Sequence, residues 1–193
     1  MNKICDLDTD IQNAIEVLKK GGVILCPTDT VWGLSCDATN ELAVEKLYKI
    51  KQRSKEISLI ILVDTSLKIQ QYVKEVPEIA WELIEASDKP LTIIFPDAKN
   101  LALNVIANDR SIGIRVCNDE FCKHLIYKYR MPLVSTSANI SGEKTPLNFN
   151  EISEELIKKV DYVVKYKQND FYKSQPSSII KLMTNGEFKI LRK

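Results

Sequence analysis

Hydroxyl and carboxylate side chains stand directly behind an apolar run near the start of the chain. Residues 27–34 read PTDTVWGL and follow the run 23–26, a pattern typical of a buried strand that opens into a polar loop. In sheets with helical crossovers, small ligands often bind just beyond the carboxyl ends of strands. Thr28 and Thr30 are therefore candidate ligand contacts, although such side chains also satisfy backbone groups in ordinary turns.

Three cations stand where an anion could bind. Lys51 and Arg53 lie two residues apart at the end of a predicted helix, where they could hold phosphate or simply extend into solvent. Arg115 lies in the apolar run 112–116 and alternates out of phase with its apolar neighbours. An arginine inside an apolar strand is rarely left without an anion. We therefore expect Arg115 to face a carboxylate, either the protein's own or a ligand's.

A second polar loop adds to this pattern. Residues 135–142 read STSANISG and follow the apolar residues 132–134. Either loop alone could be a capped turn, but two such loops and three cations together predict a pocket for a polyanion. The chain has neither a GxxxxGK[ST] nor a GxGxxG motif, so a phosphate site here would have to use side chains.

Alternating helices and strands must position these groups. Helical spacing of apolar residues predicts helices over residues 10–20, 39–51, 77–84 and 119–129, with Thr39 as a cap. Apolar runs predict strands over residues 23–26, 58–63, 91–95, 112–116, 133–136, 161–165, 178–183 and 187–191. Asn185 and Gly186 are typical of a hairpin turn. This order predicts an α/β (α+β) fold, a twisted mixed β-sheet with flanking helices, in a single domain over residues 1–193.

Composition excludes several classes of protein. Apolar residues make up 45% of the chain, yet no apolar run approaches the roughly eighteen residues that cross a bilayer. Lys plus Arg number 27 against 26 Asp plus Glu, so the whole chain has no general attraction for nucleic acid. Five cysteines without CxxC spacing and a single histidine argue against a zinc site or a disulfide framework. The polar start lacks a secretory leader, so we expect a cytoplasmic protein with no membrane partner.

These motifs together resemble the YrdC family, the threonylcarbamoyl-AMP synthases, whose hallmarks look like PTDTVYGLG, KxR, PLT, GxRxP and TSANxSG. The resemblance spans about residues 22–145, with fainter agreement at Ser177 and Arg192. It implies a twisted mixed sheet with a basic concave groove, and a reaction of L-threonine, bicarbonate and ATP that gives threonylcarbamoyl-AMP and pyrophosphate. Partner proteins of tRNA modification would then pass the activated group to the adenosine beside the anticodon.

The resemblance also implies residue roles. Lys51 and Arg53 would be catalytic, holding the triphosphate and stabilising the departing pyrophosphate. The implied threonine site comprises Thr30, Arg115, Ser135 and Ser177. The implied ATP site comprises Lys51, Arg53, Ser111, Ser137, Asn139, Thr145 and Arg192. Mg²⁺ is expected to accompany ATP, although no carboxylate cluster in the sequence marks a metal site.

Some positions depart from the family pattern, and other functions stay open. Trp32 replaces the usual Tyr, Ile57 and Ser58 replace a polar or basic residue followed by Pro, and Leu62 stands where some members have His. One alternative is a non-catalytic RNA-binding module that uses the same basic groove to contact tRNA or double-stranded RNA. Another is a carbamoyl-transfer domain of a larger maturation enzyme, which the absence of cysteine-rich zinc segments disfavours.

Overall fold

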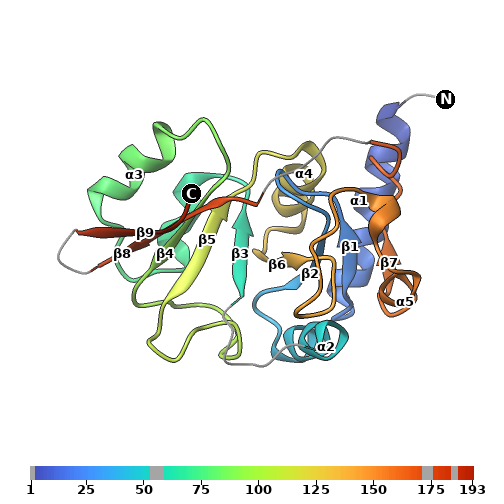
Figure 1. Ribbon diagram of the computed structural model, residues 1–193, viewed down its shortest axis with the longest axis horizontal. Helices are drawn as coiled ribbons and strands as arrows, with labels where there is room; N and C mark the ends of the chain where they lie inside the picture. The colour runs from blue at the N-terminus through green and yellow to red at the C-terminus, as the bar shows by residue number, and fades with distance from the viewer. Residues whose placement is uncertain (1–2, 53–58, 171–175, 184–186) are drawn as a thin grey trace.

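The computed structural model describes residues 3–52, 59–170, 176–183 and 187–193 (Figure 1). The helices are α1 (Lys3–Lys19), α2 (Glu41–Lys51), α3 (Glu78–Glu85), α4 (Glu120–Tyr129) and α5 (Glu154–Ile157), with 3₁₀ turns η1 (Ser66–Gln71) and η2 (Phe149–Glu151). The strands are β1 (Ile24–Cys26), β2 (Gly33–Asp37), β3 (Ile60–Val63), β4 (Leu91–Phe95), β5 (Ile112–Val116), β6 (Leu133–Ser137), β7 (Tyr162–Val163), β8 (Ser178–Leu182) and β9 (Phe188–Arg192).

These strands form one mixed sheet in the order β7-β1-β2-β6-β3-β5-β4-β8-β9. The pairs β1·β7, β3·β5 and β4·β8 are parallel, and the other neighbours are antiparallel. Helices flank the sheet, with α3 beside the end that carries β8 and β9 and α1 beside the end that carries β1 and β7 (Figure 1). The predicted fold class is thus confirmed, while the single-domain boundary and the basic character of the groove stay predictions.

Apolar side chains pack on both faces of the sheet. Successive strand residues point to opposite faces, so the neighbours Ile24 and Leu25 of β1 belong to two different apolar clusters. The Ile24 cluster also contains side chains of α1 and α4, such as Ile11 and Phe121. The Leu25 cluster contains those of α2, such as Leu47. Apolar side chains therefore pack against both faces of the sheet.

Strand β2 is the main element that the sequence did not predict. It follows β1 after a loop of residues 27–32 and pairs with β1 on one side and β6 on the other. The polar motif is consequently the loop of a β1–β2 hairpin. Residue pairs such as Ser35 and Ser135 bring the two hydroxyl-rich segments beside each other.

The predicted cap of α2 was wrong by one residue. Asn40 is the cap, because its side-chain oxygen accepts hydrogen bonds from the backbone N–H groups of Leu42 (3.0 Å) and Ala43 (3.1 Å). The hydroxyl of Thr39 instead donates to Asp37 Oδ1 at 2.7 Å. The helix ends at Lys51, followed by a residue in the left-handed conformation.

The described cysteines and the single histidine lie in different environments. Cys26, Cys36, Cys117 and Cys122 are buried free thiols. The side chain of His124 is on the exposed face of α4. In the part of the chain described, no helix is long and apolar enough to cross a membrane.

We expect Asn40→Ala to lower the free energy of unfolding by about 1 kcal/mol, because two backbone N–H groups at the start of α2 lose their acceptor. Urea denaturation measures this change. Thr39→Ala is the matched control, since it removes a hydroxyl that caps no helix, and we expect a smaller loss. A larger loss for Thr39→Ala than for Asn40→Ala would contradict the assignment of the cap.

Candidate functional site

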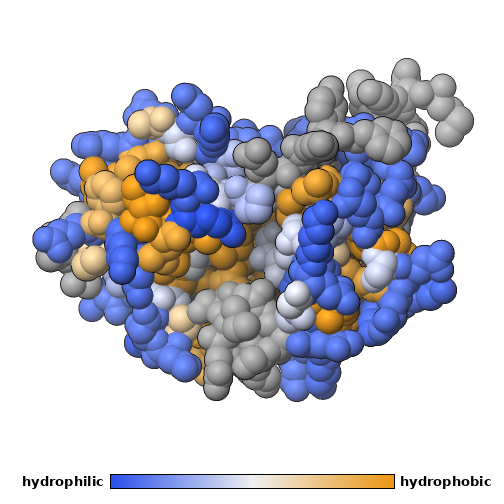
Figure 2. All heavy atoms as spheres, in the orientation of Figure 1, coloured by the Kyte–Doolittle hydropathy of each residue, from blue (hydrophilic) through white to orange (hydrophobic). Residues whose placement is uncertain are grey.

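The central strands surround a cavity of about 240 Å³, which we call the central cavity. The space-filling view shows the molecule hollowed near its middle, between the half that carries β8 and β9 and the half that carries β1 and β7 (Figure 2). Seven of the predicted site residues line the central cavity: Thr30, Arg115, Ser135, Ser137, Thr145, Ser177 and Arg192. The fold therefore brings residues from both ends of the chain to one place.

Arg115 is the most deeply placed cation of the central cavity. Its side chain is only 4% exposed, and its Nη2 lies 3.1 Å from Asp29 Oδ1 and 3.5 Å from Thr28 Oγ1. The prediction that Arg115 faces a carboxylate is confirmed by this ion pair. Its Nε is also buried, yet this atom has no hydrogen-bond partner. A buried N–H without an acceptor is costly, so the guanidinium can still take an anionic oxygen.

A second guanidinium approaches from the last strand. Arg192 donates through Nε to the carbonyl oxygen of Ser177 (2.8 Å) and through Nη2 to the Ser177 hydroxyl (3.4 Å). Burial, and after it the positive charge of Arg115, lower the pKa of Arg192. Arginine nevertheless stays charged at neutral pH. The central cavity thus has two neighbouring positive groups, an arrangement that attracts an anion.

Thr92 is a cavity residue to which the sequence analysis gave no role. It is fully buried on β4, its oxygen lies 2.8 Å from the Ser177 hydroxyl, and its neighbour across the β4–β5 ladder is Arg115. Within the family-like segment PLT it could have been singled out as a polar residue in an apolar strand. Ser177 was already in the implied threonine site, but its contact with Thr92 could not be predicted, because it exists only through the pairing of β4 with β8.

Lys51 does not extend into solvent, so that interpretation of the helix end was wrong. The residue is 2% exposed, and its ammonium group donates to the Ser137 carbonyl oxygen, to the Ser137 hydroxyl (3.1 Å) and to Asn139 Oδ1 (2.9 Å). The backbone N–H of Ser141 in turn donates to the Lys51 carbonyl oxygen at 3.0 Å. Lys51 and Asn139 therefore form one polar network with Ser137, which lines the central cavity. Arg53 lies outside the described residues.

Ser111 does not line the central cavity. It precedes β5, and its hydroxyl donates to Asp109 Oδ1 at 2.5 Å, where its backbone N–H also bonds at 3.0 Å. Lys181 Nζ lies 2.8 Å from the other oxygen of Asp109. These hydrogen bonds, that of Lys181 first, lower the pKa of Asp109 to about 2. An ATP contact for Ser111 stays a prediction.

Two of the positions that depart from the family pattern, Trp32 and Leu62, do not line the central cavity. Trp32 packs its ring against Phe149, with centroids 4.9 Å apart, and lines a neighbouring cavity. Leu62 is fully buried in an apolar cluster with Ile24. Ile57 and Ser58 lie outside the described residues.

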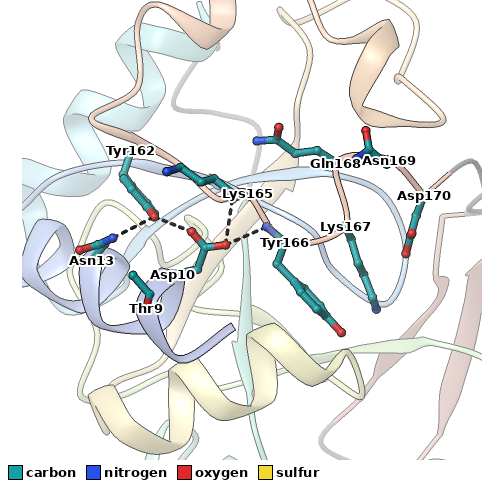
Figure 3. A pocket seen from close by; sticks show the side chains of 10 residues that line it. All are labelled: Thr9, Asp10, Asn13, Tyr162, Lys165, Tyr166, Lys167, Gln168, Asn169 and Asp170. Carbon is teal, nitrogen blue, oxygen red and sulfur yellow. Dashed lines mark hydrogen bonds between the residues drawn. The ribbon is translucent and has the colours of Figure 1, made fainter. Parts of the chain in front are cut away.

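A larger cavity, of about 490 Å³, lies between α1 and the segment that follows β7 (Figure 3). The carboxylate of Asp10 there accepts from the Tyr162 hydroxyl (2.5 Å) and from the backbone N–H groups of Lys165 (3.0 Å) and Tyr166 (2.7 Å). None of the residues that line this cavity was predicted as a site residue. Because its buried carboxylate is already satisfied, we place the candidate site in the smaller central cavity.

Several known proteins are similar to this chain in sequence. A model of the Sua5/YciO/YrdC family, described as "Telomere recombination", matches residues 16–193. The chain is 35% identical over 182 residues to the threonylcarbamoyl-AMP synthase of Pseudoalteromonas translucida, which covers 93% of this chain and 96% of that relative. It is 37% identical over 186 residues to a Methanocaldococcus jannaschii protein whose name assigns it the same activity, covering 93% and 86%.

Solved structures give the same picture for the fold. The P. abyssi Sua5 structure complexed with L-threonine matches with a TM-score of 0.83 and 25% identity, covering 94% of this chain and 53% of that chain. This chain thus spans about half the length of that Sua5 protein. The E. coli YciO structure matches with a TM-score of 0.82 and 24% identity over 95% of this chain and 88% of its own, a likeness of fold.

Ser111→Ala is expected to raise the pKa of Asp109 from about 2 toward its ordinary value of 3.8, because one hydrogen bond to the carboxylate is lost. The pKa should stay below that value, since Lys181 and the backbone N–H remain. The lowered pKa of Asp109 stabilises the folded protein above pH 3.8, and this stabilisation is lost as the pH falls toward 2. As the pH falls from 3.8 to 2, the free energy of unfolding should therefore decrease less in the variant than in the wild type. NMR titration of the carboxyl group measures the pKa, and an unchanged value would contradict this contact.

Thr92→Val keeps the shape of a buried side chain but removes one of the two hydrogen-bond partners of the Ser177 hydroxyl, the other being Arg192 Nη2. We expect the free energy of unfolding to fall by about 1–2 kcal/mol, measured by urea denaturation. Thr65→Val is the control, because Thr65 is exposed and its side chain makes no capping hydrogen bond, so we expect a change below about 0.5 kcal/mol. Equal stability of Thr92→Val and the wild type would show that this hydrogen bond contributes nothing.

Proposed function

This chain belongs to the Sua5/YciO/YrdC family, and from that membership we propose that it is an L-threonylcarbamoyladenylate synthase. It joins L-threonine, bicarbonate and ATP and forms threonylcarbamoyl-AMP and pyrophosphate. The observation that carries the proposal is the buried guanidinium of Arg115, whose Nε has no partner and which lines a cavity rich in hydroxyl groups. The cavity thereby offers a cation for a carboxylate and donors for further oxygens.

The threonine substrate occupies the part of the central cavity around Arg115. Arg115 takes the carboxylate, because a guanidinium offers planar, paired donors that match its two oxygens. Thr30, Ser135 and Ser177 line the same cavity and are each less than 10% exposed, so their hydroxyls can bond threonine away from bulk water. The P. abyssi Sua5 protein, of similar fold, has been crystallised with L-threonine, which supports this assignment.

The ATP substrate lies along the loop that follows β6. Ser137, Thr145 and Arg192 line the central cavity, and Lys51 and Asn139 join it through the Ser137 network. Arg53 and Ser111 complete the proposed set by resemblance. The positive charges of Lys51, Arg53 and Arg192 stabilise the phosphate oxygens, most of all as negative charge moves onto the departing pyrophosphate.

The reaction needs positioning more than a nucleophilic side chain. Threonine amine and bicarbonate give a carbamate with loss of water, and a carbamate oxygen then attacks the α-phosphorus in line. The new O–P bond forms as the bond to the β-phosphate breaks, and pyrophosphate leaves with the electron pair. Holding the carboxylate at Arg115 and the phosphates at the cationic groups fixes this line of attack.

Magnesium is expected with ATP and would reduce the charge of the phosphates. Within residues 3–52, 59–170, 176–183 and 187–193, no group of three or more His, Cys, Asp or Glu side chains could hold a metal ion. The described residues therefore do not form a dedicated site. The phosphate oxygens and water are the oxygen ligands that Mg²⁺ commonly takes in such complexes.

The product serves the threonylcarbamoyladenosine modification of tRNA. Partner proteins of that pathway accept the intermediate, and this chain can act without touching tRNA itself. No feature of the described residues favours the alternative of a non-catalytic RNA-binding module. A cytoplasmic location agrees with the four free, buried thiols.

Incubation with ATP, bicarbonate and each amino acid, followed by measurement of pyrophosphate, tests the function. We expect release to depend on threonine. Lys51→Ala should lower kcat by about 100-fold or more. The phosphates lose a nearby positive charge, and Ser137 and Asn139 lose the ammonium group that donates to them. Arg115→Ala should raise the KM for threonine by about 100-fold, equivalent to about 2.7 kcal/mol.

The control for Lys51→Ala is Lys46→Ala, on the same helix but paired with Asp161, because neither of these two residues lines the central cavity. It should keep the wild-type rate. A wild-type protein that releases no pyrophosphate with threonine would overturn the proposed function, and normal turnover in both site variants would overturn the residue roles.

A further inference from the structure

Asp29 forms an ion pair with the Arg115 guanidinium. Its Oδ1 lies 3.1 Å from Arg115 Nη2, and both side chains are buried, 8% and 4% exposed respectively. Asp29 is absent from the lining of the central cavity and instead lines the neighbouring cavity of about 330 Å³, together with Thr28 and Trp32. It therefore contacts Arg115 on a side that is not the threonine side.

Both oxygens of this carboxylate are engaged at the end of β5. Oδ1 also accepts from the Cys117 thiol (3.4 Å), and Oδ2 accepts from the backbone N–H of Asn118 (3.4 Å). One carboxylate thus joins the hairpin loop 27–32 to Arg115 and to the two residues just beyond β5. With Nη2 held in this way, the guanidinium cannot rotate freely.

Asp29 also offsets part of the positive charge in this region. Arg115 and Arg192 are neighbouring guanidiniums, since the charge of Arg115 acts on Arg192. Asp29 supplies one compensating negative charge in a buried setting, where removal of one partner of an ion pair leaves a costly lone charge. If Asp29 were neutral, the central cavity would attract small anions of every kind more strongly, and these would compete with the amino acid.

We propose that Asp29 is a positioning residue for the amino-acid substrate. It holds the Arg115 guanidinium in the position in which it takes the threonine carboxylate, and it offsets one positive charge that would otherwise favour inorganic anions. This inference rests on the proposed function, because it takes the ligand of Arg115 to be the carboxylate of threonine. It assigns Asp29 to threonine selection and gives it no part in ATP binding.

The test compares Asp29→Asn and Asp29→Glu with the wild-type full chain. Calorimetry measures the Kd of L-threonine, and pyrophosphate release gives the KM of threonine and of ATP. Asp29→Asn should raise the Kd and KM of threonine by about 10-fold or more, leave the KM of ATP within about twofold, and make inorganic phosphate a stronger competitor of threonine. Asp29→Glu keeps the charge, so phosphate should compete as in the wild type while threonine binding recovers in part.

Asp64→Asn is the matched control. Asp64 is also a buried carboxylate, 2% exposed in its side chain and 2.7 Å from a lysine, Lys68, but it lines neither the central cavity nor its neighbour. It should lower stability without changing the ratio of the two KM values. A merely structural role of Asp29 would give the same result as this control.

Several outcomes would overturn the inference. A folded Asp29→Asn variant that binds threonine with the wild-type Kd would do so. An equal rise in the KM of threonine and the KM of ATP would also do so. If Asp29→Asn does not fold, Asp29→Glu decides by the same ratio of KM values. A wild-type protein that does not bind threonine also overturns it, whereas one that binds threonine but releases no pyrophosphate overturns only the proposed function.

Discussion

A positive charge inside a protein needs an anion or several oxygens close by, and this requirement organises the middle of the sheet. Arg115 meets it through Asp29 of the β1–β2 hairpin loop. Lys51 meets it through Ser137 at the end of β6 and Asn139 in the loop that follows. Arg115 thus holds the β1–β2 hairpin loop, and Lys51 holds the loop after β6. The same bonds leave the central cavity lined by hydroxyl groups and by the guanidiniums of Arg115 and Arg192, which suits an anionic ligand.

Local pattern was enough to predict most strands and the class of the fold. The runs at β4 and β5 are apolar and bounded by polar residues, so their limits were predicted as observed. Strand β2 was missed because its sequence, GLSCD, contains Gly, Ser and Asp, which are uncommon in strands. Its pairing with β1 and β6 on either side outweighs this weak local preference, and no such pairing can be read from five residues.

The candidate site was predicted where chemistry alone marks a residue and was incomplete where geometry decides. Arg115 stands out as a charge in an apolar strand, and the need for a carboxylate followed from that. That the carboxylate is Asp29 depends on the hairpin loop reaching the end of β5, which residue types do not specify. Lys51 shows the opposite limit, because a lysine at a helix end is usually solvated, and only the loop after β6 buries it.

The order of the strands has a consequence for how the protein acquires activity. The central cavity is walled by β3 and β5 but also by β8, which joins the sheet through β4, with Leu91 beside Ser178. Such pairings between distant parts of a chain form slowly, because closing a long loop costs conformational entropy before any stabilising contact forms. During synthesis on the ribosome, the first 170 residues could fold in large part and still be catalytically silent. The central cavity would become complete only when the β8–β9 hairpin pairs with β4 and brings Ile179 and Arg192 to it.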